Sequence, residues 1–134
     1  MSNVDLWGDI PIENGIKLPV TILKEQATIL GEKTDKILEA KVNSVNVADK
    51  DIVGYELKII APALSNFSYG VLSVFHSLVL VYPLNMSHQN STGKWTTSKC
   101  KDEAEFTAKL REILSSEVIH TVIVSLISQS KAAV

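Results

Sequence analysis

The apolar positions of this chain recur at helical spacing near the N-terminus. A helix is predicted from Pro19 to about Leu30, because proline suits a first helical turn, where its missing N–H costs nothing. The apolar residues that follow share one face of that helix, which is the pattern of a helix packed on a core: Val20, Leu23, Ala27 and Leu30. Gly31 comes directly afterwards and is predicted to form the left-handed cap that ends the helix.

Two more helices are predicted near the C-terminus. Asp102, with Glu105 three residues later, has the spacing of a capping box at a helix start. The buried stripe of this helix is predicted to hold four residues, namely Phe106, Leu110, Ile113 and Leu114. Ser115-Ser116 then offers an N-cap for a last helix. Its β-branched content favours a strand, but the helical period of residues 118–127 favours a helix.

Between these helices the apolar positions alternate every second residue, which is the period of a half-buried strand. One such strand is predicted from Leu38 to Asn43, with a bulge or strand end near Ser44, where the alternation changes phase. A second is predicted from Val53 to Ala61, and Pro62 ends it because proline cannot donate to the ladder.

Two further segments, from about Ser68 to His76 and from Leu78 to Leu84, are apolar at both parities. That pattern is typical of strands buried on both faces. Two explanations are open: helices or the N-terminal arm of the same chain cover the second face, which is the favoured one, or another chain does. Residues 85–93 are predicted to form a polar loop, and Trp95 to Ser98 a short edge strand.

Together these elements predict an α+β fold: an antiparallel four- to five-stranded meander sheet, preceded by one helix and followed by two C-terminal helices. Residues 1–17 are predicted to be an irregular N-terminal arm, and residues 18–131 a single domain. Leu6, Trp7 and Ile10 make the arm apolar enough to dock, either on its own domain or on a partner. Trp95, in the edge strand, is a further candidate for a partner contact.

Composition narrows the classes of function. The chain has 134 residues, 46% of them apolar, and a net charge of −2, and Arg111 is its only arginine, so nucleic-acid binding is not expected. No apolar stretch is long enough to cross a membrane, and the first residues do not form a signal peptide. A single cysteine cannot form an internal disulfide, which favours a reducing, cytoplasmic location.

No catalytic or metal-binding motif is recognisable. The glycines are scattered singly, so no phosphate-binding loop is predicted, and the three histidines lie in different elements, so no metal or other cofactor is predicted. Cys100 is a candidate reactive thiol, because a helix N-terminus and the neighbouring Lys99 and Lys101 favour the thiolate.

His76 is the residue on which a small-ligand site would depend. It ends an apolar strand, and a pocket is hypothesised around it and three tyrosines: Tyr55, Tyr69 and Tyr82. The more ordinary interpretation is a core histidine whose ring bonds a backbone carbonyl.

The function predicted from these observations is that of a small cytoplasmic, non-catalytic binding protein, which acts through a protein partner or as a homo-oligomer. Small acidic bacterial proteins of this build often serve as immunity proteins, chaperones or accessory subunits, an analogy of size and charge alone. The alternative is a small-ligand binder or enzyme with its pocket around His76.

Overall fold

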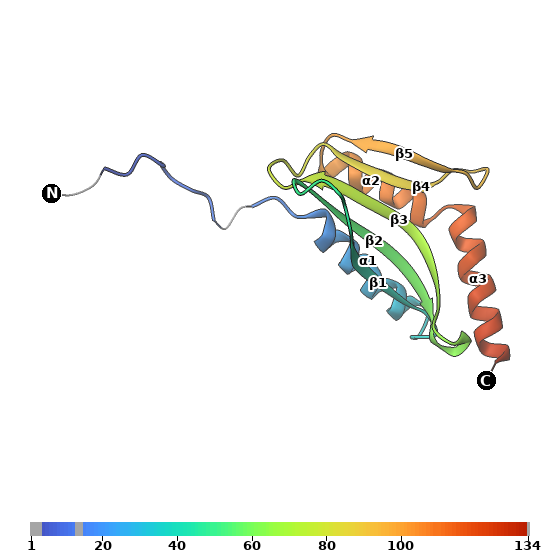
Figure 1. The fold of residues 1–134 in the computed structure, drawn as a ribbon. Helices are drawn as coiled ribbons and strands as arrows, with labels where there is room; N and C mark the ends of the chain where they lie inside the picture. The colour runs from blue at the N-terminus through green and yellow to red at the C-terminus, as the bar shows by residue number, and fades with distance from the viewer. Residues whose placement is uncertain (1–3, 13–14, 134) are drawn as a thin grey trace.

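The computed structural model describes residues 4–12 and 15–133 and has the predicted α+β fold. Its elements follow in the order α1 (Pro19–Lys33), β1 (Glu39–Val45), β2 (Ile52–Ala61), the 3-10 turn η1 (Pro62–Leu64), β3 (Phe67–Ser77), β4 (Leu84–Gln89), β5 (Trp95–Cys100), α2 (Glu103–Leu114) and α3 (Glu117–Ala132). The five strands form one antiparallel meander in the order β1-β2-β3-β4-β5 (Figure 1).

Helix α1 is longer than predicted, because Gly31 lies inside it and does not cap it. The chain reverses at Asp35 and Lys36, whose φ angles are 52° and 64°. Thr34 joins the helix to the strand that follows: its hydroxyl donates to Leu30 O at 3.0 Å, and Leu38 N donates to the Thr34 Oγ1 at 3.2 Å. The threonine hydroxyl and two left-handed residues therefore make the turn that the glycine was expected to make.

The caps of the two C-terminal helices agree with the sequence. Asp102 Oδ1 accepts from Glu105 N at 2.8 Å at the start of α2, and the Glu105 carboxylate accepts in return from Lys101 N at 2.9 Å. Ser116 Oγ accepts from Ile119 N at 3.3 Å at the start of α3. Each bond satisfies a backbone N–H that has no partner within the helix.

The strand predicted from Leu78 to Leu84 is wrong, and the polar loop predicted after it contains a strand. Residues 78–83 form an exposed loop, with Val79 85% exposed. Strand β4 follows it, with Leu84, Met86 and His88 buried and polar residues between them. The period of two was present in β4, but the prediction had assigned Leu84 to the preceding strand. In residues 85–89 that left Met86 as the single apolar residue, because His88 reads as polar.

Of the two alternatives predicted near Ser44, the strand end is confirmed, because β1 ends at Val45. The bulge is not found there, and a register shift lies elsewhere in the sheet. Strands β1 and β2 pair in one continuous register. The shift occurs between β2 and β3, where Leu57 pairs with Leu72 but Lys58 pairs with Gly70. Val71 is therefore an extra residue, and it is buried together with Leu72. The bulge adds a second apolar side chain to the core at this point.

All three helices pack on one face of the sheet (Figure 1), over a core that includes Leu23, Leu57, Leu72 and Phe106. The opposite face has no helix or arm over it in the described part of the chain, so the expected cover from within the chain is wrong. That face carries polar residues such as Glu56, Lys58, Ser73 and Ser87, with Ile60 and Phe75 among its apolar residues. The ring carbons of Phe75 come within 2.7 Å of where a Cβ on Gly54, its cross-strand partner, would stand, so any side chain at residue 54 would displace the ring.

Residues 4–12, the described part of the N-terminal arm before its gap, do not pack on the domain (Figure 1). Leu6 is 89% exposed, Trp7 84% and Ile10 63%. Of the two predicted alternatives, docking on the parent domain is therefore not observed. Among the helices described, none is long and apolar enough to cross a membrane.

Candidate functional site

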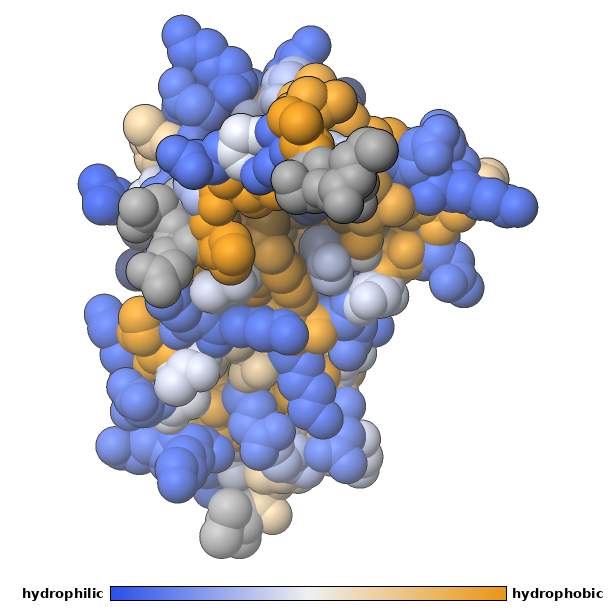
Figure 2. Space-filling model, turned by 90° about the vertical axis from the view of Figure 1, so that its left-hand side faces the viewer, coloured by the Kyte–Doolittle hydropathy of each residue, from blue (hydrophilic) through white to orange (hydrophobic). Residues whose placement is uncertain are grey.

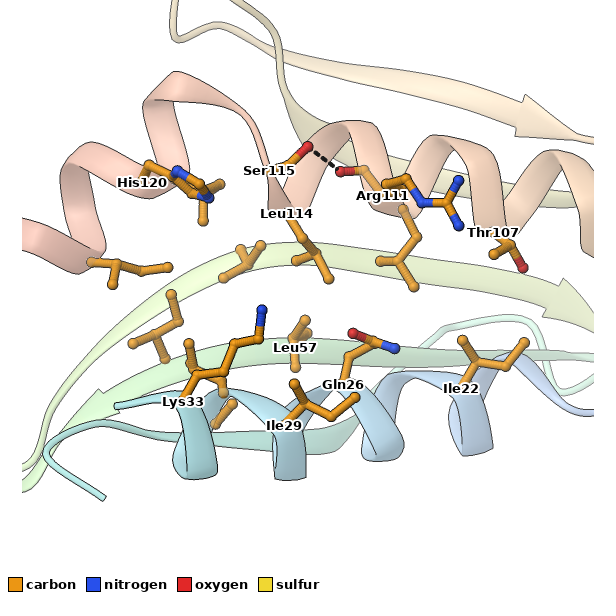
Figure 3. Close-up of a pocket in the computed structure, with 17 residues that line it drawn as sticks. Ile22, Gln26, Ile29, Lys33, Leu57, Thr107, Arg111, Leu114, Ser115 and His120 are labelled. Carbon is orange, nitrogen blue, oxygen red and sulfur yellow. Dashed lines mark hydrogen bonds between the residues drawn. The ribbon is translucent and has the colours of Figure 1, made fainter. Parts of the chain in front are cut away.

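An apolar groove of about 400 Å³ runs between α1 on one side and α2 and α3 on the other (Figure 3). Its floor is the helix-covered face of the sheet, formed by Ala40, Leu57, Ile59 and Val71. The groove exists because α1 packs mainly on β1, whereas α2 approaches β5 and α3 approaches β2 and η1. The helices therefore leave part of the sheet between them uncovered.

The walls of the groove are aliphatic. Ile22, Ile29 and Leu30 line it from α1, and the other wall is formed by Leu110, Leu114, Ile119 and Ile123 of α2 and α3. Ile29 is 38% exposed although it is fully apolar. The apolar stripe of α1 is wider than the strip that packs on β1, and this excess width is the sequence signal that could have indicated the groove.

The rim of the groove is basic. Lys33 of α1 faces Arg111 of α2 and His120 of α3 across the opening, together with Gln26, Thr107 and Ser115 (Figure 3). None of the lining residues is acidic. Within the described residues, Lys33 and Arg111 take part in no ion pair, and the four pairs present lie elsewhere: Lys17–Glu25, Lys58–Glu56, Lys101–Glu105 and Lys109–Glu112.

The groove offers an apolar binding surface with positive charge and a histidine on its rim. The Ser115 hydroxyl donates to Arg111 O at 2.6 Å and so is engaged in ending α2. In the described part of the chain no three His, Cys, Asp or Glu residues gather as metal ligands would. Aliphatic walls beneath two cationic side chains suit an apolar segment or chain that also carries carboxylates.

The hypothesised tyrosine pocket is not assembled as one site. Tyr55 and His76 are neighbours, with ring centroids 6.4 Å apart. His76 is buried, and its Nδ1 lies 2.9 Å from Ser77 O, which is the contact of an ordinary core histidine. Tyr69 is seven residues away along β3, roughly 23 Å in an extended strand, and its hydroxyl donates to Gln89 Oε1 at 3.1 Å.

Tyr82 lies in the loop before β4, and its hydroxyl is buried with no hydrogen-bond partner among the described residues. Burial, with a smaller contribution from the Glu103 carboxylate, raises the pKa of Tyr82 from 10.0 to about 12. The phenol is therefore neutral at physiological pH. It forms no polar contact with His76 and lines neither wall of the groove.

Cys100 is buried at the end of β5. Burial raises the pKa of its thiol, and the Glu105 carboxylate adds to the shift more than Lys109 opposes it. This direction is opposite to the one expected from the helix N-terminus and the two neighbouring lysines. The thiol is protonated at neutral pH and out of contact with water.

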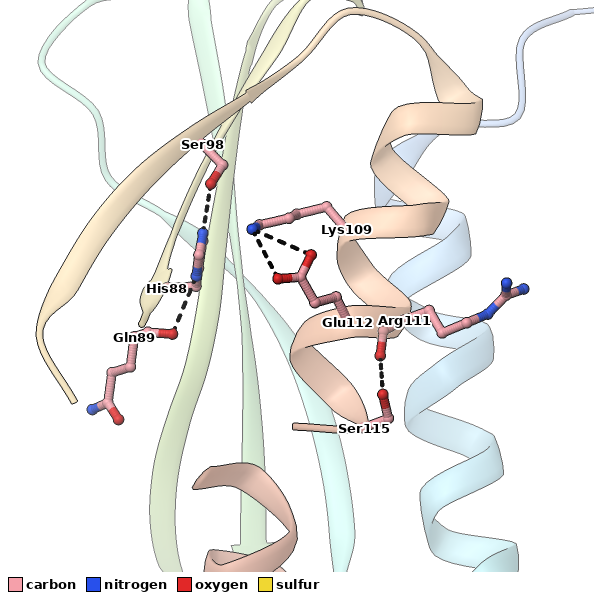
Figure 4. A network of polar contacts seen from close by, with 7 residues as sticks. All are labelled: His88, Gln89, Ser98, Lys109, Arg111, Glu112 and Ser115. Carbon is pink, nitrogen blue, oxygen red and sulfur yellow. Dashed lines mark hydrogen bonds and ion pairs between the residues drawn. The ribbon is translucent and has the colours of Figure 1, made fainter. Parts of the chain in front are cut away.

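The structure brings together one polar pair that the sequence did not suggest. His88 Nε2 and Ser98 Oγ lie 2.7 Å apart on the neighbouring strands β4 and β5, and His88 Nδ1 lies 3.2 Å from Gln89 O (Figure 4). The carbonyl must accept, so Nδ1 carries the proton and the serine hydroxyl donates to Nε2. A serine and a histidine at this distance resemble a nucleophile and its base, but His88 is only 4% exposed.

The candidate contact residues are placed as follows. Trp95 is 54% exposed at the start of β5, an edge strand. Leu6, Trp7 and Ile10 are exposed on the arm. The groove residues Ile29, Lys33 and Arg111 were not singled out from the sequence, because they come together only when α1 and α2 flank the same strip of sheet.

Neither a protein-family model, nor a curated protein, nor a solved structure matches this chain.

Proposed function

We propose that this chain is a non-catalytic binding protein that holds an apolar, acidic peptide segment in the groove between α1 and α2/α3. The observation that carries the proposal is the combination of aliphatic walls with an unpaired basic rim in the described residues. The partner is a protein, and the predicted cytoplasmic location belongs to the same proposal.

Burial of apolar side chains in the groove supplies the affinity, at roughly 25 cal/mol per Å² of apolar surface removed from water. Lys33 and Arg111 supply selectivity, because carboxylates placed between them gain charge-assisted hydrogen bonds that neutral peptides lack. His76, His88 and Cys100 are buried away from the groove, while His120 lies on its rim. A role in binding uses the aliphatic walls and the positively charged rim of the groove.

Selection from a random-peptide library displayed on phage, against the immobilised chain, tests the proposal. We expect enrichment of peptides that combine aliphatic residues with Asp or Glu. Fluorescence anisotropy then measures their affinity for two variants. Ile29→Glu places a charge in the groove wall and should weaken binding about tenfold or more. Val124→Glu makes the same kind of change at an exposed position of α3 outside the groove and should leave binding unchanged.

The rim is tested by a second matched pair. Lys33 and Lys131 are the basic residues in the last turns of α1 and α3, so Lys33→Glu and Lys131→Glu make the same change at equivalent helix positions. Only Lys33→Glu should weaken peptide binding, and added salt should reduce the difference between the variants. Peptides that bind Ile29→Glu and Lys33→Glu as well as the wild type would overturn the proposal. So would binding of oleate in the groove with no peptide enriched.

A further inference from the structure

The N-terminal arm is an apolar, acidic segment of the kind that the groove suits. Residues 4–12 contain Asp5 and Asp9 and no basic residue. The arm's large apolar side chains are exposed: Val4, Leu6, Trp7, Ile10 and Ile12 are all between 63% and 89% exposed. So many exposed apolar side chains in one short segment indicate a surface that is covered by something else.

The order of residues in the arm matches the groove. In an extended segment alternate side chains point to opposite sides. Val4, Leu6, Ile10 and Ile12 all have even numbers, whereas Asp5 and Asp9 have odd numbers. One side of the extended arm is thus aliphatic, and the other carries the carboxylates together with Trp7. The aliphatic side can meet the floor of the groove while the carboxylates meet its basic rim.

The lengths also agree. Along α1 the groove extends from Ile22 to Lys33, roughly 17 Å at the helical rise per residue. From Leu6 to Ile12 an extended chain spans roughly 20 Å. In the free arm Trp7 N donates to Asp5 Oδ1 at 2.9 Å, and Gly8 has a φ of 65°. The segment therefore straightens at these residues when it docks, at the cost of one exposed hydrogen bond.

The arm is presented away from its own groove. Lys17, close to the start of α1, forms an ion pair of 2.7 Å with Glu25 of α1, and the arm then leads away from the domain (Figure 1). Figure 2 views the molecule from this end, where hydrophobic residues gather in several patches in the upper half. Exposed Leu78, Val79 and Leu80 of the β3–β4 loop belong to the same end of the sheet.

We infer that the arm of one copy of this chain occupies the groove of a second copy, so that two chains exchange arms in a two-fold symmetric dimer. In such a dimer each copy supplies one arm and one groove, and the same contact forms twice. Asp5 and Asp9 of one copy lie beside Lys33 and Arg111 of the other. The inference rests on the proposed function, since it names the segment that fills the same groove.

The oligomeric state of the full chain in solution tests the exchange. Sedimentation velocity should give twice the monomer mass of 14.7 kDa for the wild type. Leu6→Asp with Ile10→Asp should give the monomer mass, and so should Ile29→Glu. Phe67→Asp with Val124→Asp is the matched control: it also places two aspartates at exposed apolar positions, both outside the arm and the groove, and it should remain a dimer.

A mixing experiment separates exchange between chains from an arm that folds back on its own domain. The arm variant Leu6→Asp/Ile10→Asp keeps an intact groove, and the groove variant Ile29→Glu keeps an intact arm. Mixed together, they should form a heterodimer with one restored contact, although each alone is monomeric. A wild type of monomer mass, or a mixture without heterodimer, overturns the exchange.

The final measurement distinguishes failure of this inference from failure of the proposed function. A synthetic peptide of residues 4–12 and the library-selected peptides are each titrated against the full-length Leu6→Asp/Ile10→Asp chain. Binding of both, with loss in the added Ile29→Glu variant, supports the inference. Binding of the library peptides alone overturns the inference and leaves the proposed function standing. Binding of neither overturns both.

Discussion

The helix-covered face of the sheet has two regions that differ in kind. Over β4 and β5, where α2 packs, the face is closed: Met86 and Phe106 are fully buried, and the polar His88 and Cys100 are buried among them. Between α1 and α2/α3, over β1 to β3, the same face is open and lined by aliphatic side chains beneath a basic rim.

The difference separates the buried histidine–serine pair and thiol from the apolar surface and positive charge that the groove exposes. The histidine–serine pair and the thiol lie in the closed region, where they act as core residues with satisfied or neutral groups. The open groove carries mainly apolar surface and positive charge. A surface of that kind gains affinity through burial and contributes little to the stability of the free chain, and this contrast can be tested by substitution.

The largest effect is expected at the centre of the closed region. Phe106→Ala removes a fully buried ring and should lower the free energy of unfolding by about 3–5 kcal/mol. Phe67→Ala is the control, because Phe67 is 50% exposed and its loss leaves no closed cavity. Urea denaturation followed by circular dichroism measures both. A similar cost for the two variants would contradict the division into closed and open regions.

The buried polar pair should give the next largest effect. Ser98→Ala leaves Nε2 of the buried His88 without its donor and should cost about 1–3 kcal/mol of stability. Thr97→Ala, at the exposed neighbouring position, should change stability by less than about 0.5 kcal/mol. An unchanged midpoint for Ser98→Ala would show that the pair is not part of a satisfied core.

Tyr82 tests the polar edge of the closed region. Tyr82→Phe removes a buried hydroxyl without a partner and should raise the free energy of unfolding at neutral pH by about 1 kcal/mol. The folded pKa of about 12 lies above the usual 10.0. The folded state therefore keeps the phenol proton more tightly than the unfolded state does. The stability that this difference provides is complete below pH 10 and is lost as the pH rises from 10 to 12.

The wild type should accordingly lose more stability over that alkaline range than Tyr82→Phe does. Phenolate absorbance gives an independent measurement, since one tyrosine of the folded wild type should titrate near pH 12 and this step should be missing in the variant. If the alkaline loss is equal in both proteins, the phenol is solvated and the closed region does not extend to Tyr82.

The smallest effect is expected in the open groove. Ile29→Ala shortens a partly exposed wall residue on a helix, where the loss of apolar contact and the gain in helix propensity oppose each other. Stability should change by no more than about 0.5 kcal/mol, while affinity for the selected peptides falls. A large loss of stability would show that the groove wall belongs to the folding core.

Local patterns in the sequence predicted the elements that depend on near neighbours. The capping-box spacing of Asp102 and Glu105 predicted α2, and the cap residue Ser116 predicted α3, each together with the apolar period that follows it. Both predictions succeeded because capping and helical period act within a few residues. The alternation around Leu57 predicted β2 in the same way. Gly31 misled the prediction of the α1 end, since Thr34 and two left-handed residues provided a different stop.

The strand assignment failed where burial decided the outcome. Leu78, Val79 and Leu80 are as apolar as a core strand yet form an exposed loop, whereas the more polar β4 lies in the sheet with His88 buried. Hydropathy gives the cost of exposing a side chain, but pairing with β3 and β5 and the hydrogen bond from Ser98 decided which segment was buried.

The sequence by itself determined the fold class, since helical and alternating periods are properties of neighbouring residues. It also determined that the arm is apolar and acidic. Only the tertiary structure decided that Ile29 and Lys33 of α1 face Arg111 of α2 across an open strip of sheet. Arg111 is 78 positions from Lys33 and 82 positions from Ile29 in the chain. Their meeting depends on how far apart two helices pack on one sheet, which no local pattern encodes.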